Sequence, residues 1–249
     1  NQISLGDLIR VLKITKEENH FLVTNKKNIN FFKKLTNKRV KNIKTFKYLT
    51  FKGNIINLVI GKRLEDAFFD INNYIKHKTS KVKTFKVFDY LNERFDTPLN
   101  KTIKIKRKKN LKIGFNSIVP KNWHIKSYPK KNWNALEKKL KSSDLKINIL
   151  RQKKNNLFDY LSWIKQCDLL VSVVGLGVHI CNYLDKQVVM LAGPTNFSES
   201  KKDKNIFQIF PEKRCSVHKK KLNVYFKNCS CMRNISPTKV YNKVLSVIN

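Results

Sequence analysis

Two glycine-containing turns in the second half of the chain carry the clearest chemical signal in the sequence. Gly175 and Gly177 follow the apolar run Asp168–Val174, and the turn Gly193–Thr195 follows a second apolar run. A glycine has no Cβ, so the backbone can turn tightly there and approach a ligand closely. Backbone amides at the start of a helix suit a phosphate group. The pattern predicts a phosphate-binding edge; a strand–helix–strand unit without a ligand is the alternative, because a glycine-rich turn is a weak motif.

Two polar side chains next to these turns could contact the same ligand. His179 falls in the first turn of the helix expected after Gly177 and could donate a hydrogen bond to a phosphate oxygen. Thr195 follows Gly193 and Pro194 and could line the site through its hydroxyl and backbone. A lone histidine near a helix start is often a structural residue, so both interpretations of His179 stay open.

A third group of residues has metal-binding chemistry. Cys215, His218, Cys229 and Cys231 form the pattern C-x2-H-x10-C-x-C. Three thiolates and one imidazole can complete a tetrahedral zinc shell. The single residue between Cys229 and Cys231 is a tighter spacing than is usual for zinc ligands. The sequence therefore favours reduced cysteines that pack a loop and no bound metal, with a zinc site as the alternative.

Alternating apolar and amphipathic segments predict an α/β fold with parallel sheets and helices on each face. Strands are expected at His20–Thr24, Asn54–Ile60, Leu111–Asn116, Lys146–Leu150, Asp168–Val174, Gln187–Ala192 and Ile206–Phe210. Helices are expected at Asp7–Lys13, Ile29–Leu35, Leu64–Ile75, Asn132–Leu140, Leu157–Cys167 and Val178–Leu184, and a terminal helix begins at Ser236-Pro237. Serine at the N-cap followed by proline is a strong helix start.

The segment Asp168–Thr195 resembles the C-terminal domain of glycosyltransferase family 9, the ADP-heptose:lipopolysaccharide heptosyltransferases. The family pattern there is S-x-D-T-G-x-x-H, then a helix, then P-V-V-x-L-x-G-P-T. Ser172, His179 and Val188–Thr195 match this pattern. The family's aspartate falls on Val174, so this chain lacks that carboxylate.

Three further segments resemble the same family and lie in the family's order. Ser4–Asp7 (SLGD) matches its S-x-G-D turn, and Cys231–Ile248 matches its C-M-x-x-I-x-P-x-x-V ending. Trp123–Leu140 resembles its K-x-W-P segment and the following amphipathic helix, with Tyr128 in place of the tryptophan. The part between Phe21 and Lys109 matches little of the family.

The resemblance implies the GT-B architecture, in which two Rossmann-like domains face each other across a cleft. We expect a short N-terminal acceptor-side domain at residues 1–105 and a C-terminal nucleotide-sugar-binding domain at residues 106–249. The chain begins at Asn1 without a methionine, and three residues precede the Ser4 turn. The first strand is therefore expected to be truncated, with residues missing upstream.

The resemblance also implies roles for individual residues in an inverting, metal-independent sugar transfer. Asp7 would be the base that takes the proton from the acceptor hydroxyl, in a turn that includes Ser4 and Gly6. Capping of the following helix is the alternative role for Asp7. Lys126 falls on the family lysine that contacts the donor phosphates, and an ammonium suits a departing diphosphate. The rest of the donor site would comprise Gly175, Gly177, His179, Gly193, Pro194 and Thr195.

The net charge of +36 is extreme and indicates anionic partners. The lysines are spread from end to end among asparagine, isoleucine and phenylalanine, which is typical of an AT-rich genome rather than of a nucleic-acid-binding patch. Such a charge would attract the protein to anionic lipid headgroups. No apolar run is long enough to span a bilayer, and five cysteines do not suggest a disulfide scaffold. We expect a cytoplasmic protein, peripheral at the inner membrane, with no nucleic-acid partner.

These features together predict a glycosyltransferase without a cofactor. It would move a sugar from a nucleotide-sugar donor, with ADP-heptose as one candidate, to a lipopolysaccharide-like or other cell-surface glycan acceptor. The alternative is a catalytically inactive protein of the GT-B fold that binds anionic glycolipid. Asp7 favours catalysis, whereas Val174 in place of the family's aspartate counts against it.

Overall fold

The computed structural model describes residues 110–153, 156–195, 203–220 and 228–248, together with short pieces nearer the N-terminus. Those pieces are residues 5, 6, 9, 13, 22–24, 28–36, 40–42, 57–60 and 68–70. The chain divides into two compact units, Asn1–Thr97 and Pro98–Asn249. In the described part of the chain, no helix combines the length and the apolar character that crossing a membrane requires.

The second unit is built on a five-stranded parallel sheet with the strand order β6-β5-β7-β8-β9. Its strands are β5 (Leu111–Asn116), β6 (Ile147–Arg151), β7 (Leu169–Val173), β8 (Gln187–Leu191) and β9 (Ile206–Ile209). In chain order this is the 2-1-3-4-5 arrangement of doubly wound sheets. The order reverses between β5 and β7, and open α/β sheets bind ligands outside the carboxyl ends of the strands at such a point.

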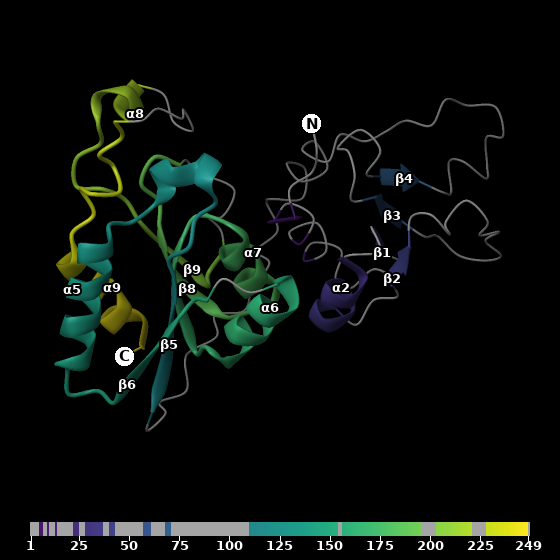
Figure 1. The fold of residues 1–249 in the computed structure, drawn as a ribbon, viewed down its shortest axis with the longest axis horizontal. Coiled ribbons are helices and arrows are strands. Elements are labelled where there is room, and N and C mark those ends of the chain that lie inside the picture. Colours follow the sequence, from purple (N-terminus) through teal and green to yellow (C-terminus); the bar gives the residue numbers. More distant parts are fainter. Residues whose placement is uncertain are drawn as a thin grey trace. The chain divides into compact units, whose positions relative to one another are not determined.

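Helices cover both faces of this sheet (Figure 1). Helix α5 (Lys130–Lys141) packs against α9 (Pro237–Ile248), and α6 (Leu157–Gln166) packs against α7 (Leu176–Tyr183). Figure 1 shows the first pair on one side of the strands and the second pair on the other. Every residue of β7 and β8 is consequently buried, which explains why their sequences are almost continuously apolar.

The helices begin and bury their apolar faces as their sequences predict. Asn156 caps α6, because its side-chain oxygen accepts a 2.9 Å hydrogen bond from the Asp159 amide. Ser236 caps α9 in the same way through the Lys239 amide at 3.3 Å. Helix α5 buries Leu136 and Leu140 in the core between the sheet and α9, on the face that 3.6-residue periodicity defines.

The first unit contains a four-stranded sheet with the order β2-β1-β3-β4. Its strands are β1 (Leu22–Thr24), β2 (Val40–Asn42), β3 (Asn57–Ile60) and β4 (Phe68–Asp70). Strand β1 is parallel to both β2 and β3, whereas β4 is antiparallel to β3. Helix α2 (Ile29–Leu35) buries Phe31, Phe32 and Leu35.

The elements predicted in the second unit are confirmed to within a few residues, and the strand Leu111–Asn116 matches to the residue. In the first unit, the helix Ile29–Leu35 also matches to the residue. The helix predicted at Leu64–Ile75 is wrong, because Phe68–Asp70 forms β4. The two aromatic residues favour a strand, and Phe68 pairs with Val59 of β3. The sequence did not predict β2, the 3-10 helix η4 (Lys121–Lys126) or α8 (Ser216–Lys220).

A mixed α/β fold with a parallel sheet is confirmed. The predicted boundary between residues 105 and 106 falls in segment 101–109, which lies outside the described residues, and the arrangement of two domains across a cleft stays a prediction. Near the start of the chain, Leu5, Gly6, Ile9 and Lys13 are helical, in agreement with a helix at that place.

The core packing of α5 makes a first prediction about stability. Leu136 is fully buried, so Leu136→Ala should lower the free energy of unfolding by about 2–5 kcal/mol through lost apolar contact and a residual cavity. Leu145 is 40% exposed, and Leu145→Ala is the matched control, with an expected change within about 0.5 kcal/mol. Chemical denaturation measures both variants, and equal effects would contradict the assigned core.

Candidate ligand site at the carboxyl edge of the parallel sheet

The residues predicted to bind a donor gather where the parallel strands of the second unit end. Gly175 is the second residue after β7, and Gly193 is the second residue after β8. The two strands are in register, with Val173 opposite Leu191, so both turns leave the same edge of the sheet at the same level. The connection that carries Lys126 also begins at this edge, at the end of β5.

A buried polar network joins the ends of β5 and β7. The Asn116 amide donates a 2.6 Å hydrogen bond to the Ser172 hydroxyl, which donates to the Val173 carbonyl at 2.7 Å. The Tyr160 hydroxyl from α6 donates to the Asn116 side-chain oxygen at 2.9 Å. Burial raises the pKa of Tyr160, so the phenol stays a donor at neutral pH. Each member therefore has a partner, and the network fixes the sheet at its switch point.

Gly177 is required by this network. A Cβ at Gly177 would lie 2.5 Å from both the Asn116 amide nitrogen and the Tyr160 hydroxyl. Real Cβ contacts are not that close, so a larger residue would force these two side chains apart. The glycine thus has a packing role that the sequence pattern alone did not reveal.

Gly193 is also a packing residue. A Cβ there would meet the Met232 side chain, with Cγ at 2.9 Å, and the Met232 backbone nitrogen at 3.2 Å. Pro194 and Thr195 are buried beside it, with Thr195 8% exposed. The turn after β8 therefore lies directly against the segment that leads into α9.

Gly175 differs from the other two glycines. Its backbone is extended, with φ 165° and ψ −164°, and it precedes the first residue of α7. Nothing lies within 4 Å of the place that a Cβ would occupy, so this position faces open space. Open space beside the first amides of a helix, which have no intrahelical partner, is where an anionic ligand can bind.

The side chains predicted to line the donor site are held by the protein itself. His179 is the fourth residue of α7 and is buried. Lys126 is 5% exposed, and its ammonium lies 3.7 Å from the centroid of the Trp123 ring, a cation–π contact. Tyr128 donates a 3.0 Å hydrogen bond to the Ile235 carbonyl, and burial raises its pKa. The K-x-Y-P segment is thereby anchored to the chain before α9.

The acceptor-side residues are only partly described. Gly6 is buried and helical, whereas Ser4 and Asp7 lie outside the described residues. Their predicted roles in the acceptor turn and in proton transfer therefore stay predictions. Val174, at the position of the family's aspartate, is buried and apolar. Its side chain supplies no polar group, so backbone amides are the groups that the turn after β7 offers to a ligand.

The structure brings Cys215, His218, Cys229 and Cys231 together in the connection between β9 and α9. One potential ligand atom from each residue lies within 4.8 Å of all the others. Partial burial acts to raise the pKa of the Cys215 thiol, but hydrogen bonds with His218 lower it to about 6. Burial raises the pKa of Cys231 to about 12.

Sequence reasoning missed three residues on which this edge depends, namely Asn116, Tyr160 and Met232. Asn116 gave a usable signal, because it is the one amide at an otherwise apolar strand end. In the structure it pairs with Ser172 of β7. Tyr160 gave none, and Met232 was part of the C-M ending that resembles the family but had no assigned role. Their importance comes from packing against Gly177 and Gly193, which are distant in sequence.

Comparison with known proteins supports the fold. No family model matches the chain, and no curated protein matches it in sequence. Among solved structures, E. coli heptosyltransferase WaaC with ADP-2-deoxy-2-fluoro heptose is similar, with a TM-score of 0.51 and 12% sequence identity. The similarity covers 98% of this chain and 97% of that chain. At this identity the likeness shows a similarity of fold alone.

The contrast between Gly177 and Gly175 is testable. Alanine is favoured over glycine inside a helix by about 1 kcal/mol, so helix propensity alone would make Gly177→Ala stabilising. We expect instead a loss of about 1–3 kcal/mol, because the added Cβ overpacks the Asn116–Tyr160 network. Gly175→Ala, the matched control, should be nearly neutral. Denaturation curves measure both, and a Gly177→Ala variant as stable as the parent protein would refute the packing role.

Proposed function

We propose that the protein is a glycosyltransferase that transfers a sugar from a nucleotide-sugar donor to a glycan acceptor. The observation that carries the proposal is the open position at Gly175, beside the first amides of α7 and next to the switch point of the sheet. Its support is the likeness of nearly the whole chain to a heptosyltransferase fold. The preferred donor is a nucleoside diphosphate sugar, with ADP-heptose as the first candidate.

The chemistry of the leaving group fits this edge. As the glycosidic bond to the donor phosphate breaks, negative charge develops on a diphosphate that has to be stabilised. The helix start at Leu176 offers backbone amides and the positive end of a helix dipole. Because Val174 supplies no carboxylate, the donor phosphates meet no negative side chain there. Lys126 is proposed to add a positive charge after moving from its contact with Trp123.

Transfer also requires a base for the acceptor hydroxyl. We assign this role to Asp7, next to Gly6 and Ser4. The proposed acceptor is a lipopolysaccharide-type glycolipid, whose phosphates the net charge of +36 would attract to the protein. The same field would hold the protein at the anionic cytoplasmic face of the inner membrane without a hydrophobic anchor.

A second candidate function is non-catalytic binding of an anionic glycolipid. The observation in its favour is Val174, a buried apolar residue where the resembled family has an aspartate. The two functions differ in one measurable respect. A transferase releases the nucleoside diphosphate when donor and acceptor are both present, whereas a binding protein leaves the donor intact.

Donor binding can be tested with a panel of nucleotide sugars scored by thermal shift. We expect a nucleoside diphosphate sugar to raise the melting temperature. Gly175→Ala should weaken this donor about tenfold or more, because its methyl group enters the space assigned to the phosphates, while the ligand-free melting temperature stays unchanged. Leu145→Ala is the control for ligand binding. Unchanged donor affinity in the Gly175→Ala variant would show that the donor does not bind at this edge.

Catalysis can be tested at Asp7. Asp7→Asn keeps the size of the side chain and one acceptor oxygen but removes the base, so the transfer rate should fall by roughly 10²–10⁴-fold. Donor affinity should remain that of the parent protein, since the base acts on the acceptor. Release of nucleoside diphosphate measures the rate. A folded Asp7→Asn variant that turns over at the parental rate would exclude Asp7 from the mechanism.

A further inference from the structure

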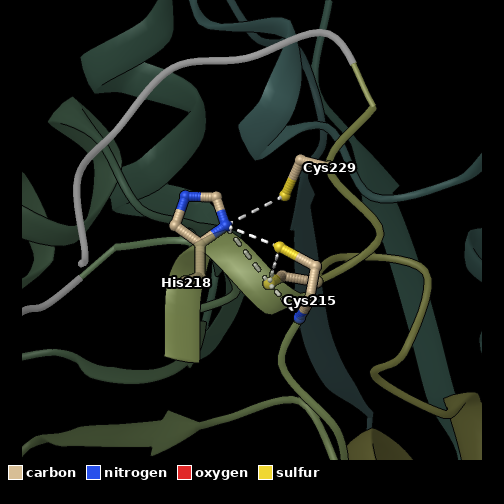
Figure 2. A group of neighbouring side chains, drawn as sticks. Cys215, His218 and Cys229 are labelled. Carbon is tan, nitrogen blue, oxygen red and sulfur yellow. Dashed lines mark hydrogen bonds between the residues drawn. The ribbon is translucent and has the colours of Figure 1, made fainter. Parts of the chain in front are cut away.

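The connection between β9 and α9 contains a cluster of side chains that the proposed sugar transfer does not use. His218 directs its Nδ1 atom at three sulfur atoms, those of Cys215 at 2.9 Å, Cys229 at 3.5 Å and Cys231 at 3.5 Å. The Cys215 and Cys231 sulfur atoms are 3.5 Å apart. Figure 2 shows the imidazole nitrogen and the sulfur atoms turned toward a common centre.

These separations are close to those of a tetrahedral zinc site. Zinc–sulfur bonds of about 2.3 Å and zinc–nitrogen bonds of about 2.0–2.1 Å give ligand separations of about 3.6 Å for N–S and about 3.8 Å for S–S. Two of the N–S separations and the Cys215–Cys231 S–S separation are 3.5 Å. Of these four atom pairs, the Cys215–His218 pair, at 2.9 Å, is the one that has to move apart appreciably.

The fold brings a helical pair of ligands and the closely spaced pair together. Cys215 and His218 are three residues apart at the start of α8, where the Lys219 amide donates to the Cys215 carbonyl at 3.0 Å, so both side chains share one helix face. Cys229 and Cys231 come from the following turn. The pair with tight spacing would therefore share an ion with a helical pair, so that only one of the two pairs comes from a loop.

The surroundings suit a structural metal ion. His218 and Cys231 are buried at 1% and 0% exposure, while Cys215 and Cys229 are partly exposed and leave a route of entry. Four protein ligands complete the tetrahedron and leave no position for a reacting water. Three thiolates and a divalent ion carry a net negative charge. A pocket of about 360 Å³ beside Cys215 presents the positive groups that balance it, namely Lys213, Arg214, Lys219 and Lys220.

We propose that Cys215, His218, Cys229 and Cys231 bind one zinc ion. The ion would cross-link the start of α8 to the segment before α9, at the carboxyl edge of the sheet. This cross-link lies next to residues that pack at the same edge. Met232, adjacent to Cys231, packs on Gly193, and the Ile235 carbonyl accepts the hydrogen bond of Tyr128. Zinc binding would replace the thiol protons and contribute directly to folding of this segment. This proposal does not depend on sugar transfer.

The test uses the full chain purified without a chelator. Elemental analysis should give about one zinc per chain, and exchange for Co²⁺ should give a thiolate-to-cobalt charge-transfer band and the visible bands of tetrahedral cobalt. Chelation should lower the melting temperature. Zinc far below one per chain together with no cobalt band would overturn the proposal, as would stoichiometric iron or a Cys215–Cys231 disulfide in the isolated protein.

Variants locate the ion. Cys229→Ser replaces a partly exposed ligand and should weaken zinc binding at least about 100-fold, and Cys229→Ser with Cys231→Ser should abolish the cobalt charge-transfer band. Cys167→Ser is the matched control, because Cys167 lies outside the cluster and its sulfur donates to the Trp163 carbonyl, as a serine hydroxyl could. It should retain one zinc. Stoichiometric zinc in the double variant would place the ion elsewhere and contradict the assignment.

Discussion

The burial of β7 and β8 on both faces is the constraint on which the rest of the second unit depends. Each of these strands is buried along its whole length, because α5 and α9 cover one face of the sheet and α6 and α7 cover the other. A ligand therefore cannot reach the strands through their faces. The carboxyl edge, where the backbone leaves the core and small residues follow the strand ends, is where open α/β sheets bind their ligands.

This edge consists of a rigid frame and one open position. The Asn116–Ser172–Tyr160 network fixes the ends of β5 and β7, and Gly177 exists because that network leaves no room for a Cβ. Gly193 packs on Met232, which follows the cysteine–histidine cluster. Gly175 alone among these three glycines faces open space. Three glycines that look alike in sequence thus have different physical roles. Packing explains Gly177 and Gly193, whereas Gly175, which packing does not explain, is the position proposed to contact a ligand.

Most strands and helices of the second unit could be predicted, because an apolar run such as Asp168–Val174 leaves little choice other than a buried strand. What failed was decided by contacts between distant residues. Phe68–Asp70 is a strand because β3 lies beside it. The sequence also does not show that Cys215 and His218 converge with Cys229 and Cys231 on one point. The acceptor-side residues Ser4 and Asp7 lie outside the described chain, so their roles depend on the family resemblance alone.

A crystal structure of the protein with ADP locates the diphosphate without requiring the correct sugar or acceptor. If the donor binds at Gly175, phosphate oxygens will lie within hydrogen-bonding distance, about 2.7–3.2 Å, of the Leu176 and Gly177 amides. The basic pocket lined by Lys213, Arg214, Lys219 and Lys220 is a competing site for an anion. A diphosphate bound there, with the space at Gly175 filled by solvent, would rule out a donor site at Gly175.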